Sequence, residues 1–193
     1  MPAVRPCHLK RSAAAPDQRL FVLYLPGPEL TLHASVQSAS VGERSMLMEA
    51  LDQLGPDDVL VLDRGYPAAW LVALLSARGI RFVMRCDNDN DSGWGAAKAF
   101  RRSGALDSTV LLNPPSADDV RDWDCPAQAP SLRLVRQIAT NGQIRLLATN
   151  IDAENRFFKR PFPSPWRPEH GPRRPSTRVN RSLKVSLKVA ENC

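Results

Sequence analysis

The sequence lacks the long apolar runs of a membrane protein and the paired cysteines of a zinc site. No stretch approaches the ~18–20 consecutive apolar residues that span a bilayer, so we expect no membrane partner. The four cysteines include no Cys-x-x-Cys pair, and the three histidines add no spacing that suits a metal ligand set. We therefore expect reduced thiols and a cytoplasmic location.

Positive charge is in excess, but only at the C-terminal end. The net charge is +6. Residues 160–193 contain eight Lys or Arg against Glu169 and Glu191, whereas the rest of the chain holds equal numbers of each sign. The same segment has six prolines and almost no apolar periodicity until its very end. Charge alone therefore favours weak, salt-sensitive DNA binding by this tail rather than by the body of the protein.

Apolar patterns in the first half of the chain predict an α/β fold. Val59-Leu-Val-Leu62 is a continuous apolar run, typical of a central strand that is covered on both faces. Ser40, with Glu43 three residues later, indicates a capped helix start. The expected elements are strands over 19–26 and 29–36, a helix over 41–54, a strand over 58–63, a helix from Pro67 to near Gly79 and a strand over 80–85. Strands that alternate with helices in this way are typical of an α/β unit.

After Cys86 the pattern of alternating strands and helices no longer continues. A polar stretch over 87–107 precedes three β-like runs, and Asn141-Gly142 between the last two predicts a hairpin. The runs cover 108–112, 132–139 and 143–149, and they indicate an antiparallel β insertion attached to the core. The expected organisation is a poorly ordered segment 1–18, a core 19–86, a β-rich insertion 87–150 and a disordered basic Pro/Arg-rich tail 151–193.

Asp63 is the one residue whose position indicates chemistry. It follows the predicted central strand, and open α/β sheets place functional residues at the carboxyl ends of their strands. A carboxylate there can bind Mg²⁺ through oxygen. It can equally be structural, accepting hydrogen bonds from the backbone of the next turn. Position alone leaves both roles open.

The residues around Asp63 resemble those of a known family. Val59-Leu-Val-Leu-Asp63-Arg64-Gly65-Tyr66-Pro67, then a helix and Gly79-Ile-Arg-Phe-Val-Met-Arg85, is similar to the second conserved block of DDE-class bacterial insertion-sequence transposases. The Asp-Arg-Gly-Tyr element between strand and helix is the specific part. The resemblance covers roughly residues 19–155 and includes the segment Leu147-Ala-Thr-Asn150. It implies an RNase H-like mixed-sheet core interrupted by an antiparallel β insertion.

The resemblance also implies an activity, DNA transposition. In that family three carboxylates (Asp, Asp, Glu) hold two divalent cations, Mg²⁺ or Mn²⁺, which activate water and later a DNA 3′-hydroxyl for attack on a phosphodiester. Asp63 matches the second aspartate, a catalytic metal ligand. Arg64 and Tyr66 would shape the turn or approach the DNA backbone, and Arg85 would also contact DNA. The implied partners are transposon ends, target DNA and the full-length transposase.

Two of the three carboxylates are not found. The first should lie on a strand paired beside the Asp63 strand and upstream of the 19–36 hairpin, but only Asp17 precedes that hairpin and its context does not fit. The third belongs to Tyr-x2-Arg-x3-Glu-x6-Lys on a later helix, and the chain has no tyrosine after Tyr66. We therefore expect a truncated or frameshifted fragment that binds metal poorly, is inactive alone and lacks a central strand, which exposes unpaired strand edges.

The tail leaves alternatives open. A frameshift near residues 156–160 would explain both the missing helix and the change in composition, whereas a functional arm would contact DNA. The corresponding second function is a non-catalytic DNA-binding product of the same element that acts through the basic tail. A more distant alternative is a nuclease of the same fold with a different acidic set.

Overall fold

The computed structural model describes residues 18–26, 28–86, 94–138, 142–152 and 182–190. No helix in these ranges is long and apolar enough to cross a membrane. In chain order the elements are β1 (Gln18–Leu25), β2 (Leu30–Ser38), α1 (Glu43–Ala50), the 3-10 turn η1 (Leu51–Gln53), β3 (Val59–Leu62), α2 (Ala69–Ala77), β4 (Arg81–Arg85), α3 (Gly95–Ser103), β5 (Asp107–Leu111), α4 (Ala117–Trp123), β6 (Ser131–Ile138), β7 (Ile144–Thr149) and β8 (Ser182–Ala190).

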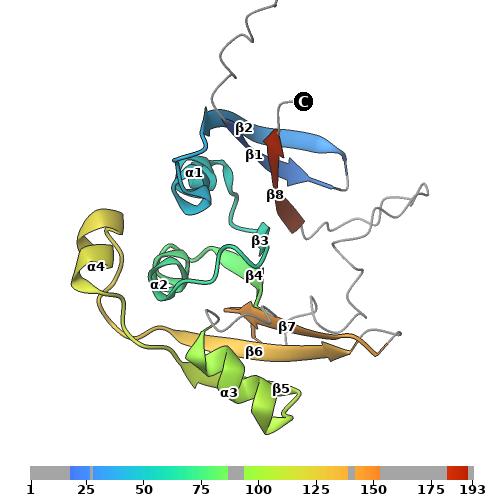
Figure 1. The fold of residues 1–193 in the computed structure, drawn as a ribbon, viewed down its shortest axis with the longest axis vertical. Coiled ribbons are helices and arrows are strands. Elements are labelled where there is room, and N and C mark those ends of the chain that lie inside the picture. The colour runs from blue at the N-terminus through green and yellow to red at the C-terminus, as the bar shows by residue number, and fades with distance from the viewer. Residues whose placement is uncertain (1–17, 27, 87–93, 139–141, 153–181, 191–193) are drawn as a thin grey trace, which may run out of the picture.

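The described strands form one mixed sheet in the order β2-β1-β8-β3-β4-β7-β6-β5 (Figure 1). β8 and β4 run parallel to β3 on its two sides, and every other neighbouring pair is antiparallel. The predicted α/β class is therefore confirmed, with β3 at the centre of the sheet.

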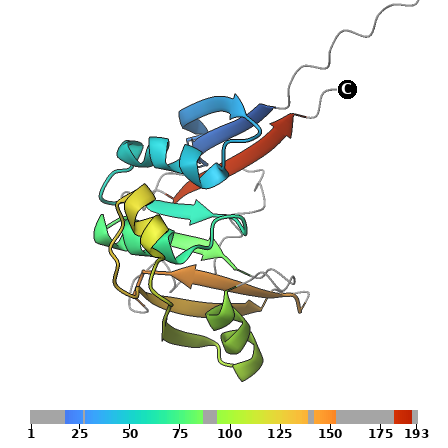
Figure 2. The same ribbon diagram turned by 60° about the vertical axis from the view of Figure 1, so that its left-hand side comes forward.

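Helices α1, α2 and α4 lie along one face of this sheet (Figures 1 and 2). Leu60 and Leu62 of β3 belong to the main buried cluster, which also draws on α1 and α2. Val59 belongs to a second, smaller cluster together with Val83 and Leu147. Alternate β3 side chains thus enter two separate clusters, which confirms the prediction of a strand buried on both faces.

The elements predicted for residues 19–86 are all present, but both helices begin later than expected. Ser40 does not cap α1: its hydroxyl lies 3.0 Å from the hydroxyl of Ser38, and Gly42 is the N-cap, without a side-chain cap. Pro67 does not begin α2, because Ala68 after it is still extended (φ −153°, ψ 140°). The α-helical part of the first helix also ends early and continues as η1.

The second half of the described chain extends the same sheet. β5, β6 and β7 pair antiparallel as predicted, and β7 pairs with β4. Gly142 has a positive φ of 77° in the connection between β6 and β7, whose residues 139–141 lie outside the described part. Two helices were not predicted. α3 lies within the stretch expected to be polar connection, and α4 precedes β6.

β8 corrects the expectations for the tail and for the centre of the sheet. Residues 182–190 were expected to be disordered, but they form a strand that pairs with β1 on one side and β3 on the other. The register sets Leu187 opposite Phe21, Val185 opposite Leu23 and Ser182 opposite Val59. The facing edges of β1 and β3, expected to be unpaired, are therefore both paired in this structure.

Candidate functional site

The site lies where β3 and β4 end. These strands are parallel, and Leu62 pairs with Met84. Asp63 follows Leu62, and Arg85 follows Met84 as the last residue of β4. The structure therefore brings Asp63 and Arg85 to the same edge of the sheet, as expected for residues at the carboxyl ends of parallel neighbours.

Asp63 begins a tight turn. Its carbonyl accepts a hydrogen bond from the Tyr66 N–H (3.3 Å), and its Oδ1 accepts one from the Arg64 N–H (2.6 Å). This is the structural role of an aspartate that ends a strand. A carboxylate has a second oxygen, and Asp63 and Arg64 are both exposed. The Asp63 side chain thus remains accessible to a cation.

Tyr66 lies in the core rather than on the surface. Only 2% of it is exposed, and its hydroxyl has no hydrogen-bond partner among the described residues. Burial raises the pKa of this hydroxyl well above its ordinary value, and the carboxylates of Glu43 and Asp63 act in the same direction. The guanidinium groups of Arg19 and Arg44 oppose this shift. Of the two roles expected for Tyr66, the buried position fits shaping the turn.

The first turn of α1 holds the Asp63 turn in place. Arg44 donates from Nη2 to the carbonyls of Gly65 (2.9 Å) and Pro67 (3.3 Å). Glu43 lies so close to Gly65 that a Cβ there would sit 2.9 Å from its Oε2. A side chain at position 65 would therefore displace the Glu43 carboxylate, which is the far end of a flexible side chain.

Sequence reasoning missed Arg19, Glu43 and Arg44 as parts of the site. Glu43 was assigned to a capping box with Ser40, and nothing in the Asp-Arg-Gly-Tyr element points to residues on α1. Arg19 lies on β1, which β8 separates from β3 in the sheet, and Glu43 and Arg44 lie on α1, so their approach to the turn depends on tertiary structure rather than on a local pattern.

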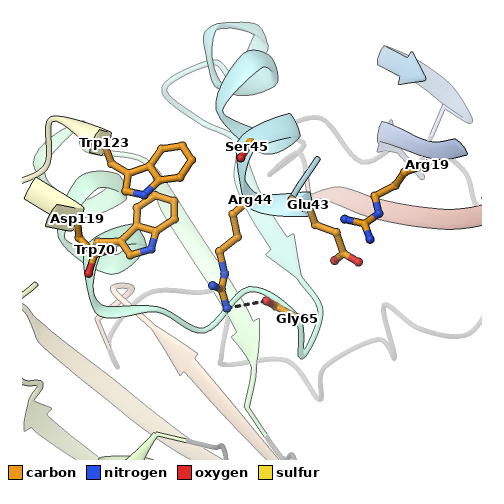
Figure 3. Close-up of a pocket in the computed structure, with 9 residues that line it drawn as sticks. Arg19, Glu43, Arg44, Ser45, Gly65, Trp70, Asp119 and Trp123 are labelled. Atoms are coloured by element: carbon orange, nitrogen blue, oxygen red, sulfur yellow. Dashed lines mark hydrogen bonds between the residues drawn. The ribbon is translucent and has the colours of Figure 1, made fainter. Parts of the chain in front are cut away.

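An open pocket of about 520 Å³ lies beside the turn (Figure 3). One wall is the stacked pair Trp70 and Trp123, whose rings are 4.4 Å apart and inclined by 4°. The pocket is lined by Arg19, Gly42, Glu43, Arg44, Ser45, Gly65, Trp70, Asp119 and Trp123. It combines an aromatic wall with charged groups of both signs.

The described residues do not fit a two-metal site. They contain no group of three or more His, Cys, Asp or Glu side chains placed to hold a metal ion. Glu43 is the other carboxylate that raises the pKa of Tyr66, but Asp63 and Glu43 alone do not make such a group. β8, the neighbour of β3, has the sequence Ser-Leu-Lys-Val-Ser-Leu-Lys-Val-Ala without a carboxylate. Asp63 would be a single ligand for Mg²⁺ or Mn²⁺.

Comparisons with protein-family models, curated proteins and solved structures found no match. The residues around Asp63 and their arrangement at the sheet edge are therefore the observations from which a function is inferred.

Proposed function

We propose that this chain is part of the catalytic domain of a DDE-class insertion-sequence transposase, with an RNase H-like core extended by an antiparallel β insertion. The observation that carries the proposal is Asp63 in an Asp-Arg-Gly-Tyr turn at the carboxyl end of the central strand β3. A helix and a parallel strand follow it, and Arg85 ends at the same edge. This local arrangement agrees with the one that the sequence resemblance implies.

The order of the strands bears on the missing first aspartate. The resemblance expects a strand beside the Asp63 strand that carries the first catalytic aspartate. In this structure β8 takes a place beside β3, on the side away from β4. Because β8 contains no carboxylate, Asp63 gains no acidic neighbour from it.

In such a site two bound cations would neutralise the charge that develops on the phosphodiester and stabilise the entering and leaving oxygens. Asp63 could hold one of them and Arg85 could contact the DNA backbone. A single carboxylate does not hold two cations, so the chain is inactive by itself and would act only together with the full-length transposase.

The test is a DNA-cleavage assay on the purified chain. Supercoiled plasmid is incubated with Mg²⁺ or Mn²⁺ and with wild-type protein or Asp63→Ala, with a chelator as control. We expect no difference between the two proteins. Nicking by the wild type that disappears in Asp63→Ala would show a working metal site and overturn the proposed inactivity.

The second candidate function is DNA binding without catalysis, through the basic tail. It is favoured by the confinement of the whole +6 charge to residues 160–193 and by the lack of a carboxylate in β8. Truncation is a poor test, because it would also remove a strand of the sheet. The sharper variant replaces five tail arginines by Gln and leaves 182–190 unchanged: Arg160, Arg167, Arg173, Arg174 and Arg178.

If the tail binds DNA, these five replacements reduce the slope of log affinity against log salt by about 4.5, since each neutralised phosphate contributes about 0.9. The control replaces three exposed arginines of the body, Arg78, Arg102 and Arg121, by Gln, and the two effects are compared per charge removed. An equal effect of both sets would mean that binding follows net charge alone and would remove the tail from the explanation.

A further inference from the structure

A small apolar cluster lies on the face of the sheet away from the helices. The main buried cluster takes side chains from each described helix, and α1, α2 and α4 lie on that side of the sheet (Figures 1 and 2). The smaller cluster, called here the strand cluster, consists of Val59, Val83, Leu147 and Ile151, with Val135 packed against it. Within the part of the chain that the structure describes, no helix contributes to the strand cluster.

The side chains of the strand cluster are nevertheless removed from water. Their exposed fractions are 1% for Val59, 0% for Val83, 1% for Leu147 and 3% for Ile151. Side chains stand roughly perpendicular to a sheet, and the neighbouring strands, about 4.8 Å away, cover only their flanks. Burial this complete requires a further layer packed on the sheet, as α1 and α2 provide on the opposite face.

The connection between β7 and β8 starts and ends beside the strand cluster. Asn150, just after β7, hydrogen-bonds to the backbone at the start of β4. Ser182, the first residue of β8, pairs with Val59 at the start of β3. Because only β4 and β3 lie between β7 and β8, a gap of about 14 Å separates the two ends, which about five extended residues would bridge. Residues 153–181 therefore provide much more chain than the crossing needs.

The first half of this connection contains the aromatic residues that could cover an apolar face. They are Phe157, Phe158, Phe162 and Trp166, and residues 157–166 are called here the aromatic segment. Each such side chain can bury about 150–250 Å² of surface. Residues 167–181, in contrast, contain no Phe, Trp or Tyr and are rich in Arg and Pro.

The other segments outside the described ranges fit the strand cluster less well. Residues 87–93 have the sequence Asp-Asn-Asp-Asn-Asp-Ser-Gly, without an apolar side chain. Residues 1–17 contain no Phe, Trp or Tyr, and they join β1 at Gln18, which pairs with Ala190 at the opposite end of β8 from the strand cluster. The remaining segments are at most three residues long.

Two arginines border the strand cluster, and both have acidic partners. Arg81, which pairs with Val59 in the sheet, forms an ion pair with Asp57 (3.6 Å). Arg133 donates to the carbonyl of Ile151 and forms an ion pair with Asp107. Guanidinium groups also attract the faces of aromatic rings, so this border suits aromatic residues.

We propose that the strand cluster is the docking surface for the aromatic segment of the same chain. The aromatic side chains then complete the core on the second face of the sheet, and the arginines of residues 167–181 stay outside this contact. The C-terminal tail thus has two parts with different roles, of which only the Pro/Arg-rich part is available to DNA. The docking does not depend on the chemistry of Asp63 and stands apart from the transposase proposal.

The test measures how fast a cysteine in the strand cluster reacts with a thiol reagent in the native full chain. Val83→Cys introduces the thiol, and the parent chain with its native cysteines gives the background rate. Replacing Phe157, Phe158, Phe162 and Trp166 together by Ala should raise the labelling rate of Val83→Cys at least about tenfold, because the cover is removed.

Leu62→Cys is the matched control, since Leu62 is fully buried on the opposite, helix-covered face. Its labelling rate should be the same with and without the four aromatic side chains. Equal acceleration at both positions would mean that the whole fold has loosened, and no acceleration at Val83→Cys would mean that other residues cover the strand cluster. Either result would overturn the proposal.

A second measurement uses the unaltered chain, so it does not depend on the folding of a variant. Trypsin can cut after Arg156 and Lys159, at the aromatic segment, and after Arg173 and Arg178, beyond it. Docking predicts that the first two sites are cut at least about tenfold more slowly than the last two. Equal rates, or faster cutting at Arg156 and Lys159, would contradict the docking.

A second copy of the chain is the other occupant that the same experiment tests. Docking within one chain predicts that the labelling rate of Val83→Cys is independent of protein concentration. Protection that increases with protein concentration would assign the strand cluster to a contact between copies and would overturn the proposal.

Discussion

The two neighbours of β3 reach it by very different routes. β4 follows β3 through the single helix α2, whereas β8 comes from the far end of the chain, after a connection over residues 153–181. Both run parallel to β3. The β4 side ends in Arg85 at the edge where Asp63 lies, and the β8 side offers Lys, Ser and apolar residues without a carboxylate.

Elements that are close in sequence build the edge where Asp63 lies, whereas β8, which is distant in sequence, completes the sheet. β3, α2 and β4 form a local unit, and contacts close in sequence require little loop closure. β8 lies between β1 and β3 and supplies backbone partners to both. The edge where Asp63 lies is thus built by residues 59–85, while the pairing of β1 and β3 into one sheet depends on residues 182–190.

The largest expected effect comes from breaking the β8 side. Lys184 pairs with Tyr24 on β1 and with Val61 on β3, so it lies where β8 has a neighbour on each side. Lys184→Pro removes a backbone donor inside a central strand and should lower the free energy of unfolding by about 3 kcal/mol or more. Thermal or urea unfolding followed by circular dichroism measures the loss.

Lys184→Ala is the matched control, because it removes the side chain and keeps the backbone N–H. It should unfold close to the wild type. Equal stability of Lys184→Pro and Lys184→Ala would mean that residues 182–190 do not belong to the sheet in solution. A tail produced by a frameshift would then be the better explanation of its composition.

A smaller effect is expected on the β4 side. Asn150 closes the end of β7 onto β4: its Oδ1 accepts from the Phe82 N–H (3.0 Å), and its Nδ2 donates to the Ile80 carbonyl (2.9 Å). Asn150→Ala leaves both backbone groups without these partners and should cost about 1–3 kcal/mol. Exposed Asn113→Ala is the control, with a change within about 0.5 kcal/mol. Identical unfolding midpoints of Asn150→Ala and Asn113→Ala would show that the Asn150 hydrogen bonds do not stabilise the fold.

The smallest expected change in stability concerns the Asp63 turn, rather than β8 or β4. Tyr66→Phe removes a buried hydroxyl without a partner, so stability near neutral pH should be unchanged or higher by up to about 1 kcal/mol. Clear destabilisation would show that the hydroxyl has a partner in solution.

The same variant has a predicted pH dependence. Because the pKa of Tyr66 is raised in the folded state, the folded chain keeps its proton at pH values where the unfolded chain, with its ordinary pKa of 10.0, has lost it. The stabilisation is complete below about pH 10 and is lost progressively above it. Urea unfolding in alkaline buffers should therefore show that the free energy of unfolding falls more steeply with rising pH for the wild type than for Tyr66→Phe. Parallel pH dependences of the two proteins would contradict the burial of the Tyr66 hydroxyl.

The elements that could be predicted are those with strong local patterns. Val59–Leu62 is short, apolar and followed by a turn, and its burial on both faces follows from that pattern. α4 could also have been found, because Ser116 and Asp119 form a capping box and have the spacing typical of one. α3 buries Ala97 and Phe100, three residues apart, which is a helical spacing that could have been found as well.

The remainder depends on contacts that no local pattern contains. The alternation of polar and apolar residues in β8 is visible in the sequence. Its position between β1 and β3 depends on two segments that are distant from it in the sequence. Asp63 could be identified from the strand end that it follows. Arg19, Glu43 and Arg44 could not, because they come from β1 and α1 and meet the turn only through the tertiary packing of the chain.

The measurement that tests the central proposal most directly is to sequence the gene with its flanks and translate every frame on both sides. The transposase proposal predicts a strand with Asp-Gly upstream, and a helix with Tyr-x2-Arg-x3-Glu-x6-Lys in a shifted frame downstream. Finding both would place Asp63 between the two carboxylates that it requires. Finding neither would contradict the proposal, and DNA binding through the basic tail would replace it.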